Sequence, residues 1–375
     1  MEYRINQKTS DQLSIIGLGT GHICVGSSIP EVEKRAVDTM HLAYEHGVNF
    51  VDLATGRSLT FSCCATAFSS VRKDIRYQIH FGACYDPQKL NSTSYSRLTN
   101  LDAVKQSVEW QLDQLKTDYI DYGMIHCLDE AKDWQAYQDG GVLDYLLDMK
   151  KQGVVRHIGL SSHTPALANK VLDTGLMELL MFSINPSYDY HHGDYPNGTA
   201  GERMDLYRRC EAEGVGITVM KPFSGGQLLD AEKSPFGQAI TKYQCIQYAL
   251  DKPGVLTVLP GVRNSQEMEE ILGFLEASPE ERDYSVLGTF VPRDAVGACV
   301  YCNHCQPCPM GLDVGLINKY YDLALAGDYM AADHYAKLDK KASGCTGCGH
   351  CDRQCPFHVN QSGRMKEISI YFKSN

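Results

Sequence analysis

This chain of 375 residues lacks two features that would place it in large functional classes. It has no apolar run near the roughly 20 residues needed to cross a bilayer, and its polar, charged start over residues 1–11 does not resemble a signal peptide. It also lacks an excess of positive charge, since 35 Lys and Arg stand against 46 Asp and Glu, for a formal net charge of −11. Phosphate binding needs a basic face. We therefore expect neither a membrane nor a nucleic acid as a partner.

A third absence concerns the fold. The fingerprint G-x-G-x-x-G of dinucleotide-binding sheets does not follow the first apolar run, where Gly17, Gly19 and Gly21 give only G-x-G-x-G. Instead, short apolar runs without alternation recur along the chain, as is typical of strands buried on both faces. The runs are 13–18, 48–53, 76–81, 119–126, 154–160, 179–184, 216–220 and 256–259. This order predicts an α/β fold with a (β/α)8 TIM barrel, and a doubly wound open sheet is the alternative.

Amphipathic stretches separate these runs, and several of them end at a glycine, as helices often do. The expected helices are 31–46, 101–115, 142–152, 165–172, 202–213, 238–250 and 265–276. We expect the barrel to span residues 1–277, followed by a charged, proline- and glycine-containing linker over 278–298. A small, mostly helical two-cluster domain would then occupy 299–375, with a helical insert at 313–341 and a closing helix at 359–372.

Two cysteine runs in the last fifth of the chain indicate iron–sulfur clusters. In the first run, two residues separate each cysteine from the next, and Pro309 follows the last one. The second run has the spacing C-x2-C-x2-C-x3-C-P. Such close spacing places three thiolates on one face of a cubane cluster, with the fourth cysteine turned toward another cluster. The runs are Cys299, Cys302, Cys305 and Cys308, and then Cys345, Cys348, Cys351 and Cys355.

We predict two [4Fe-4S] clusters with the crossed ligation of two-cluster ferredoxins. One cluster would be held by Cys299, Cys302, Cys305 and Cys355. The other would be held by Cys345, Cys348, Cys351 and Cys308, although the first run is one residue shorter than the usual pattern before Cys308. Zinc is the alternative, but zinc sites usually pair two C-x2-C units instead of placing four cysteines in a row.

The other seven of the fifteen cysteines are scattered through the predicted barrel. In a secreted protein they would suggest disulfides. Beside oxygen-sensitive clusters, loose thiols instead indicate a reducing, anaerobic cytoplasm. These cysteines are Cys24, Cys63, Cys64, Cys84, Cys127, Cys210 and Cys245.

Three polar residues, Asp52, His80 and His126, stand at the ends of successive apolar runs. Because catalytic residues of a (β/α)8 barrel lie where its strands end, we expect these side chains to point into one mouth. Both histidines can titrate near neutral pH, which suits general acid–base chemistry, and Asp52 would orient His80. A plain hydrogen bond to neighbouring backbone is the alternative role for either histidine.

Several motifs resemble the aldo-keto reductases, from the N-terminus to about residue 276. They are residues 1–14, GVNFVD at 47–52, TDYID at 117–121, IH at 125–126, GVVRHIGLS at 153–161 and PGVR at 260–263. The segments MFSINP at 181–186 and MKPF at 220–223, with the cysteine-rich end, resemble the ferredoxin-fused branch of that family. The resemblance implies a (β/α)8 barrel that binds NADP(H) and an iron–sulfur oxidoreductase acting on a small molecule.

The family uses an Asp, a Tyr, a Lys and a His, and the resemblance places the Asp at Asp52 and the His at His126. Arg57 stands where the family has its tyrosine, and His80 where it has its lysine. That tyrosine protonates the carbonyl oxygen of the substrate, so the chemistry here must differ from the usual form. Arg57 would hold a carboxylate or phosphate of the substrate through its planar fork, or else be a solvated loop residue.

The nucleotide site implied by the resemblance is only partly intact. A short polar segment before the helix expected at 265–276 is suited to phosphate oxygens. One serine matches the residue that touches the nicotinamide amide in the family, and a lysine at the end of the seventh strand lies near the expected pyrophosphate or is simply a rim lysine. The residues expected to bind NADP(H) are Ser161, Ser162, Lys221, Arg263, Asn264 and Ser265.

Two functions remain open from the sequence. The first is an enzyme that passes electrons between a substrate, or NADP(H), in the barrel mouth and an external carrier by way of the clusters. Because ferredoxin-type clusters carry one electron at low potential, the partner would be a ferredoxin, a flavodoxin or another redox protein. The second is a catalytically altered barrel that serves as the docking body of an electron-transfer module.

Overall fold

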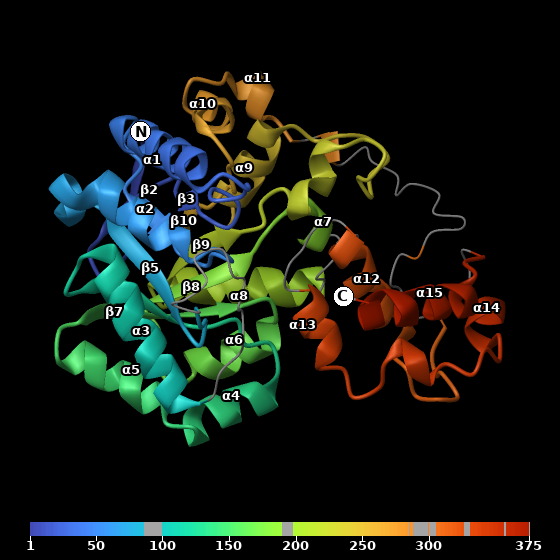
Figure 1. Cartoon of the computed structure of the whole chain (residues 1–375). Coiled ribbons are helices and arrows are strands. Elements are labelled where there is room, and N and C mark those ends of the chain that lie inside the picture. Colours follow the sequence, from blue (N-terminus) through green and yellow to red (C-terminus); the bar gives the residue numbers. More distant parts are fainter. Residues whose placement is uncertain are drawn as a thin grey trace.

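The computed structural model describes residues 1–85, 100–189, 198–284, 286–287, 299, 305–325, 331–355 and 358–374. Figure 1 shows a set of strands surrounded by helices, with the helices of the C-terminal part packed beside them. In these ranges, every helix is too short or too polar to span a membrane.

Eight parallel strands form one sheet in which each strand pairs with its neighbours in chain order. They are β3 (Leu18–Gly19), β4 (Phe50–Asp52), β5 (Arg76–Phe81), β6 (Ile120–Ile125), β7 (Val155–Ser162), β8 (Leu179–Ser183), β9 (Gly216–Met220) and β10 (Val255–Val258). The first and last strands meet through parallel bridges from Ile16 to Val258 and from Gly19 to Gly261. The sheet is therefore the predicted (β/α)8 barrel.

The seam between the first and last strands depends on glycine. The main-chain N–H of Gly17 donates to the oxygen of Val258 at 2.9 Å, and that of Gly19 donates to the oxygen of Pro260 at 3.2 Å. A Cβ added at Gly19 would lie 3.0 Å from the main-chain oxygens of Leu259 and Pro260. Side chains larger than hydrogen would thus hold the two edges apart.

The first predicted strand, 13–18, is wrong in its extent. Its start belongs to β2 (Gln12–Ser14), which pairs antiparallel with β1 (Tyr3–Ile5), and the barrel begins with the bridge of Ile16 to Val258 and with β3. This hairpin lies against the amino ends of the barrel strands, because Arg4 donates to the main-chain oxygen of Val255 and Asn6 to that of Glu178.

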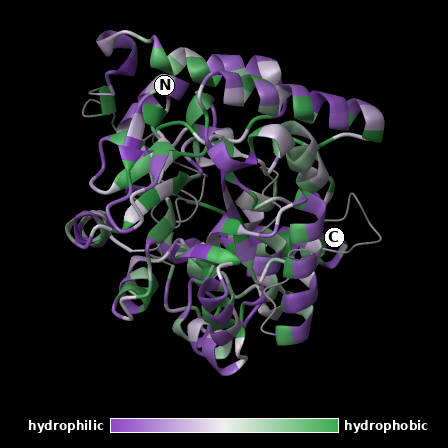
Figure 2. Ribbon diagram, turned by 90° about the vertical axis from the view of Figure 1, so that its left-hand side faces the viewer, coloured by the Kyte–Doolittle hydropathy of each residue, from purple (hydrophilic) through white to green (hydrophobic). Residues whose placement is uncertain are grey.

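Helices follow the strands and bury one face against them. In α1 (Ile29–Glu45), for example, Val32, Ala36, Met40 and Ala43 are buried at helical spacing. Figure 2 shows hydrophilic and hydrophobic residues interleaved along the long helices, as expected for one wet and one buried face. The others are α3 (Leu101–Leu115), α4 (Ala131–Asp139), α5 (Val142–Lys151), α6 (Pro165–Leu172), α7 (Pro186–Asp189), α8 (Ala200–Ala212), α9 (Lys242–Leu250), α10 (Ser265–Leu272) and α11 (Pro279–Arg282).

The helices α4, α7 and α2 (Leu59–Phe68) were not predicted, and α2 is the longest of them. Its residues are apolar nearly all round, and most of them are buried, so it lacks the amphipathic pattern by which the other helices were found. Short 3-10 turns complete the barrel at η1 (Ser69–Asp74), η2 (Ser224–Leu229) and η3 (Gly273–Leu275).

The C-terminal part is a small helical body, as predicted. The insert between the cysteine runs forms α12 (Val314–Leu325) and α13 (Ala331–Ala336), and the closing helix is α15 (Gln361–Ser374). Between them lie η5 (Ala342–Gly344) and α14 (His350–Gln354). Its core packs Cys305 and Cys351 against Leu312, Ile317 and Met365. The predicted boundaries at 277 and 298 stay predictions, since residues 288–298 lie outside the described ranges.

A buried ionic network joins three helices near the carboxyl face of the barrel. The carboxylate of Asp189, at the end of α7, accepts a hydrogen bond from Nε of Arg203 at 2.8 Å. The same carboxylate accepts from the hydroxyls of Tyr207 at 2.8 Å and Tyr248 at 2.7 Å. Arg203 is fully buried and also donates to the main-chain oxygen of Ser183. The network therefore fixes α7 to α8 and α9.

We expect Asp189→Ala to lower the free energy of unfolding of the barrel by about 3–5 kcal/mol, because it leaves the buried charge of Arg203 without its counter-ion. Asp205→Ala, on the same helix as Arg203, removes an exposed pair with Arg208 and should cost less than about 1 kcal/mol. Both tryptophans, Trp110 and Trp134, lie in the barrel, so denaturant unfolding followed by their fluorescence measures the difference. Equal losses in the two variants would contradict the network's role.

Candidate functional site

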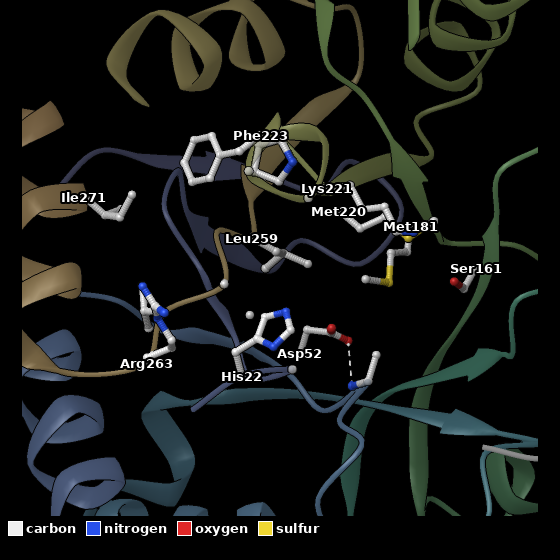
Figure 3. Close-up of a pocket in the computed structure, with 18 of the residues that line it drawn as sticks. His22, Asp52, Ser161, Met181, Met220, Lys221, Phe223, Leu259, Arg263 and Ile271 are labelled. Carbon is white, nitrogen blue, oxygen red and sulfur yellow. Dashed lines mark hydrogen bonds between the residues drawn. The ribbon is translucent and has the colours of Figure 1, made fainter. Parts of the chain in front are cut away.

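A cavity of about 540 Å³ opens where the barrel strands end. Strand ends and the following loops supply its wall, including Asp52 of β4, His80 of β5, Ser161 of β7, Met181 of β8 and Met220 of β9. Figure 3 shows Ser161 and Met181 at one end of this space and Arg263 and Ile271 at the other. The cavity is thus elongated, with one end in the barrel mouth and the other beside α10.

Asp52, His80 and His126 meet in the barrel mouth as one hydrogen-bonded chain. Oδ1 of Asp52 lies 2.9 Å from Nε2 of His80, and Nδ1 of His80 lies 3.1 Å from Nδ1 of His126. The two imidazole rings stand at 89° to each other. Each of the three side chains is almost fully buried, and each lines the cavity.

Asp52 is held in place by its other neighbours. The side-chain amide of Gln78, two residues before His80 on β5, donates to Oδ1 of Asp52 at 2.7 Å. The main-chain N–H of Ala54 donates to the same oxygen at 3.3 Å. Hydrogen bonds from several neighbours restrict the orientation of this buried carboxylate. It can therefore fix the position of His80.

The predicted nucleotide residues fall into two groups. Ser161, Lys221 and Arg263 line the cavity. Lys221 has a left-handed backbone with φ of 55°, and its main-chain oxygen accepts a hydrogen bond from Asn185 at 2.9 Å. Glycines at 225 and 226 follow it in η2 and also line the cavity, so the loop after β9 forms one wall.

The second group lies away from the cavity wall. Ser162 is buried and donates to Asp129 at 3.2 Å. Asn264 caps α10 by accepting a hydrogen bond from the N–H of Glu267 at 2.9 Å, and Ser265 lies 3.3 Å from the hydroxyl of Thr39. Asn264 and Ser265 line a separate surface hollow together with Lys34 and Arg35.

Arg57 is half-buried, and the described residues that line the cavity do not include it. Its main-chain N–H donates to the hydroxyl of Thr55 at 3.1 Å, which fixes the loop between β4 and α2. A role in holding the substrate stays a prediction for this residue.

Arg263 is engaged by an acidic neighbour on α10. Its Nε lies 2.8 Å from Oε1 of Glu267, and its main-chain N–H donates to Oε2 at 2.8 Å. Desolvation opposes the charge of Glu267, but these bonds from Arg263 outweigh it and lower the pKa of the carboxyl. An anion that binds Arg263 must therefore compete with Glu267.

A second cluster of polar side chains borders the mouth and was not predicted as a site. Cys127 and His163 both line the cavity, and Asp129 lies beside them. Burial opposes a charge on His163, but Asp129 and Cys127 outweigh that effect and raise its pKa to about 9. The signal in the sequence was weak, because Cys127 follows a strand end by two residues and Asp129 by four.

The C-terminal part contacts this cluster and also Tyr188 of the cavity wall. The ring of His334 in α13 meets the ring of His163 edge-on, with centroids 6.3 Å apart. His334 in turn stacks on Tyr320 of α12 at 5.5 Å. Tyr188, which lines the cavity, packs against Ala331 of α13. Figure 1 shows α12 and α13 on the side of the C-terminal part that faces α7 and α8.

Four cysteines of the C-terminal part surround one small cavity. They are Cys308, Cys345, Cys348 and Cys351. This is the ligand set that crossed ligation predicts, with Cys308 joining the second run, and four thiols around one space fit a cubane cluster. The main-chain N–H of Gly347 lies 3.4 Å from Sγ of Cys345, which suits a thiolate ligand.

The other predicted set is only partly described. Cys305 and Cys355 are buried in the C-terminal part, and Sγ of Cys299 lies 3.4 Å from the side-chain amide of Gln361 on α15. Cys302 lies outside the described residues.

Comparisons with known proteins agree with this architecture. Residues 15–244 match the model of the aldo/keto reductase family, and residues 295–359 match that of a 4Fe-4S dicluster domain. The uncharacterized oxidoreductase YqkF of Bacillus subtilis is 26% identical over 293 residues, which cover 70% of this chain and 87% of the relative.

Solved structures of aldo-keto reductases share the barrel. The holo form of AKR11C1 from Bacillus halodurans has a TM-score of 0.58 at 21% identity, covering 75% of this chain and 94% of that one. An aldo-keto reductase from Klebsiella pneumoniae in complex with NADPH has a TM-score of 0.55 at 15% identity, covering 77% and 95%. This chain belongs to the aldo/keto reductase family of oxidoreductases and carries a 4Fe-4S dicluster domain at its C-terminal end.

Proposed function

We propose that the protein transfers electrons between a small substrate in the barrel mouth and an external redox protein, and that Asp52, His80 and His126 handle the accompanying proton. The observation that carries the proposal is the hydrogen-bonded chain of these three residues at the cavity wall. His80 stands where the family resemblance places a lysine, and the chain offers a proton donor other than the family's tyrosine.

The direction of each hydrogen bond follows from the acceptor at one end. An ionised carboxylate only accepts, so Nε2 of His80 carries a hydrogen and donates to Asp52. In neutral His80, Nδ1 is then an acceptor, and Nδ1 of His126 must donate to it. The remaining nitrogen of His126, Nε2, is left as the base of the chain.

A proton added to this chain makes His126 an imidazolium whose Nε2–H can protonate a substrate oxygen. Asp52 stabilises that positive charge through His80, across two hydrogen bonds that already exist in the resting site. Because the donors are oriented before the reaction, little reorganisation is needed when charge develops. After the transfer, His126 is neutral again and the substrate oxygen carries the proton.

The cavity also supports a nicotinamide cofactor. Ser161 lies near the mouth, while Lys221 and Arg263 supply positive charge farther along the same space, as an extended dinucleotide would require. Bound NADP(H) would exchange a hydride with the substrate. Asn264 and Ser265 would take part only if the adenosine end extends over the rim of α10. The complex of the Klebsiella pneumoniae relative with NADPH supports this reading.

The C-terminal part supplies the route to the external carrier in this proposal. Cys308, Cys345, Cys348 and Cys351 would hold one [4Fe-4S] cluster, and Cys299, Cys302, Cys305 and Cys355 a second one. Such clusters carry single electrons at low potential. The contact between His163 and His334 supports a short path from this part to the mouth. A ferredoxin, a flavodoxin or another redox protein remains the proposed partner.

The competing function is a docking body without catalysis. It is motivated by Arg57 and His80 at the positions of the family's tyrosine and lysine. Against it stands the cost of burying Asp52 and two imidazoles in an apolar mouth. Such burial is hard to explain unless the polar chain is used.

His126→Ala should abolish substrate-dependent reoxidation of the reduced clusters, because it removes the proton donor at the cavity. Cluster absorbance should stay at its wild-type level. His46→Gln, which changes an exposed histidine at the end of α1, is the control and should leave both unchanged. Stopped-flow absorbance with dithionite-reduced protein and a panel of carbonyl and enoate compounds measures the rates. Full turnover in His126→Ala would favour the docking body.

NADPH should bind the anaerobic holoprotein at micromolar concentration and shift its own fluorescence. Arg263→Ala should weaken NADPH more than NADH, because only NADPH has a 2′-phosphate for the guanidinium. Glu267→Gln should have the opposite effect, since it releases Arg263 from its ion pair. Fluorescence titrations measure the affinities of the wild type and both variants for the two nucleotides, six in all. If neither nucleotide binds the wild type, the nicotinamide part of the proposal falls.

Cys348→Ala should remove the iron of one cluster, about four atoms per chain, because it deletes a ligand from the four-cysteine cavity. The control Cys210→Ala changes a buried thiol of the barrel and should keep the full iron content. Iron is counted by elemental analysis after anaerobic purification. A wild-type iron count in Cys348→Ala would contradict the ligand assignment.

A further inference from the structure

Three side chains with metal-binding atoms converge beside the mouth, outside the Asp52–His80–His126 chain. Nδ1 of His163 lies 3.1 Å from Oδ2 of Asp129 and 3.9 Å from Sγ of Cys127. All three potential ligand atoms lie within 4.8 Å of one another. We propose that Cys127, Asp129 and His163 form a mononuclear site for a zinc-like divalent cation at the edge of the cavity.

The backbone brings these residues together at neighbouring strand ends. Cys127 and Asp129 follow β6, and His163 follows β7, which pairs with β6 in parallel register. The main-chain N–H of Leu128 donates to the oxygen of Ser161 at 3.0 Å, which holds the two strand ends side by side. The site therefore rests on the rigid end of the barrel.

Cys127 has an unusual backbone that serves this convergence. Its φ is 41°, in the left-handed region that residues other than glycine seldom adopt. Such a conformation costs on the order of 1 kcal/mol and is concentrated at functional sites. A simple ion pair between Asp129 and His163 gives no reason for this backbone conformation. A role of the Cys127 thiolate as a ligand does, because the turn brings Cys127 beside the other two residues.

The combination of donors selects the class of cation. A thiolate, an imidazole and a carboxylate are together typical ligands of Zn²⁺, whereas Mg²⁺ and Ca²⁺ prefer oxygen alone. Three protein ligands leave a fourth position in tetrahedral geometry. Because Cys127 and His163 both line the cavity, that position is reached from the side where a substrate would lie.

Neighbouring groups orient the proposed carboxylate ligand. Oδ1 of Asp129 accepts hydrogen bonds from the hydroxyl of Ser162 at 3.2 Å and from the main-chain N–H of His163 at 2.6 Å. The hydroxyl of Thr164 lies 3.4 Å from the same oxygen. Oδ2 is thereby turned toward His163 and Cys127. Support of this kind is usual behind metal ligands.

The position of the site suggests what the cation would do. Cys127 follows His126 directly in the chain, so a cation here would lie beside the proposed proton donor. It would bind a carbonyl or carboxylate oxygen of the substrate and orient it toward His126. The metal site does not depend on the proton chain, and its test requires no turnover.

Cobalt(II) is a suitable probe, because oxidised [4Fe-4S] clusters are diamagnetic and leave its EPR signal visible. The anaerobic holoprotein with its full iron content should retain about one Co²⁺ after gel filtration. Cys127→Ala and His163→Gln should each abolish this retention. Ser162→Ala should weaken Co²⁺ binding about 10–100-fold, because it removes support for the carboxylate ligand. Cys245→Ala, a buried thiol of α9, is the matched control and should bind as the wild type does.

Iron content and the thermal midpoint of each variant establish that it is folded. If a ligand variant fails to fold, Ser162→Ala still tests the site, because it keeps all three ligands. Loss of Co²⁺ in the ligand variants, with iron unchanged, would support the site. A wild type that retains no Co²⁺ would overturn the proposal. Retention that Cys127→Ala leaves unchanged would also overturn it, since the cation would then lie elsewhere.

Discussion

Main-chain hydrogen bonds between the segment at Gly17–Gly19 and the last strand close the ring of eight strands. With the ring closed, the carboxyl ends of all strands lie on one rim, and every polar residue placed there shares one space. Asp52, His80, His126 and Ser161 come from four different strands or strand ends and yet line one cavity. The chemistry of the site thus depends on a seam where only glycine leaves enough room for the chain to pass.

His80 stands where the family resemblance implies a lysine, and this difference changes more than the charge at that position. A lysine ammonium can only donate, whereas a neutral imidazole donates from one nitrogen and accepts at the other, so it can pass a proton between two partners. His80 uses both, one toward Asp52 and one toward His126. In the function that we propose, this arrangement keeps the aspartate and the histidine that the family resemblance implies and moves the proton through His80.

The sequence was sufficient for the features that depend on local pattern. Seven of the eight predicted strands lie where their apolar runs indicated, and Asp52, His80 and His126 lie together because strand ends share a rim. Helix α2 was missed because it is apolar nearly all round. The group of Cys127, Asp129 and His163 could not be predicted, since it depends on the register of β6 with β7 and on a left-handed turn at Cys127. The separation of Ser161 from Ser162 follows from the alternation of side chains along a strand, once β7 is known to extend to Ser162.

Contact between His334 and His163, with Ala331 against Tyr188, places the cysteine-rich end directly behind two residues of the cavity wall. A shortened version of the chain that stops after the barrel would expose both surfaces to water and leave His163 and Tyr188 without this packing. Substrate selectivity measured on such a fragment would describe a wall that lacks the support it has in the intact molecule. Experiments on specificity should therefore retain the whole polypeptide, even where only the barrel is of interest.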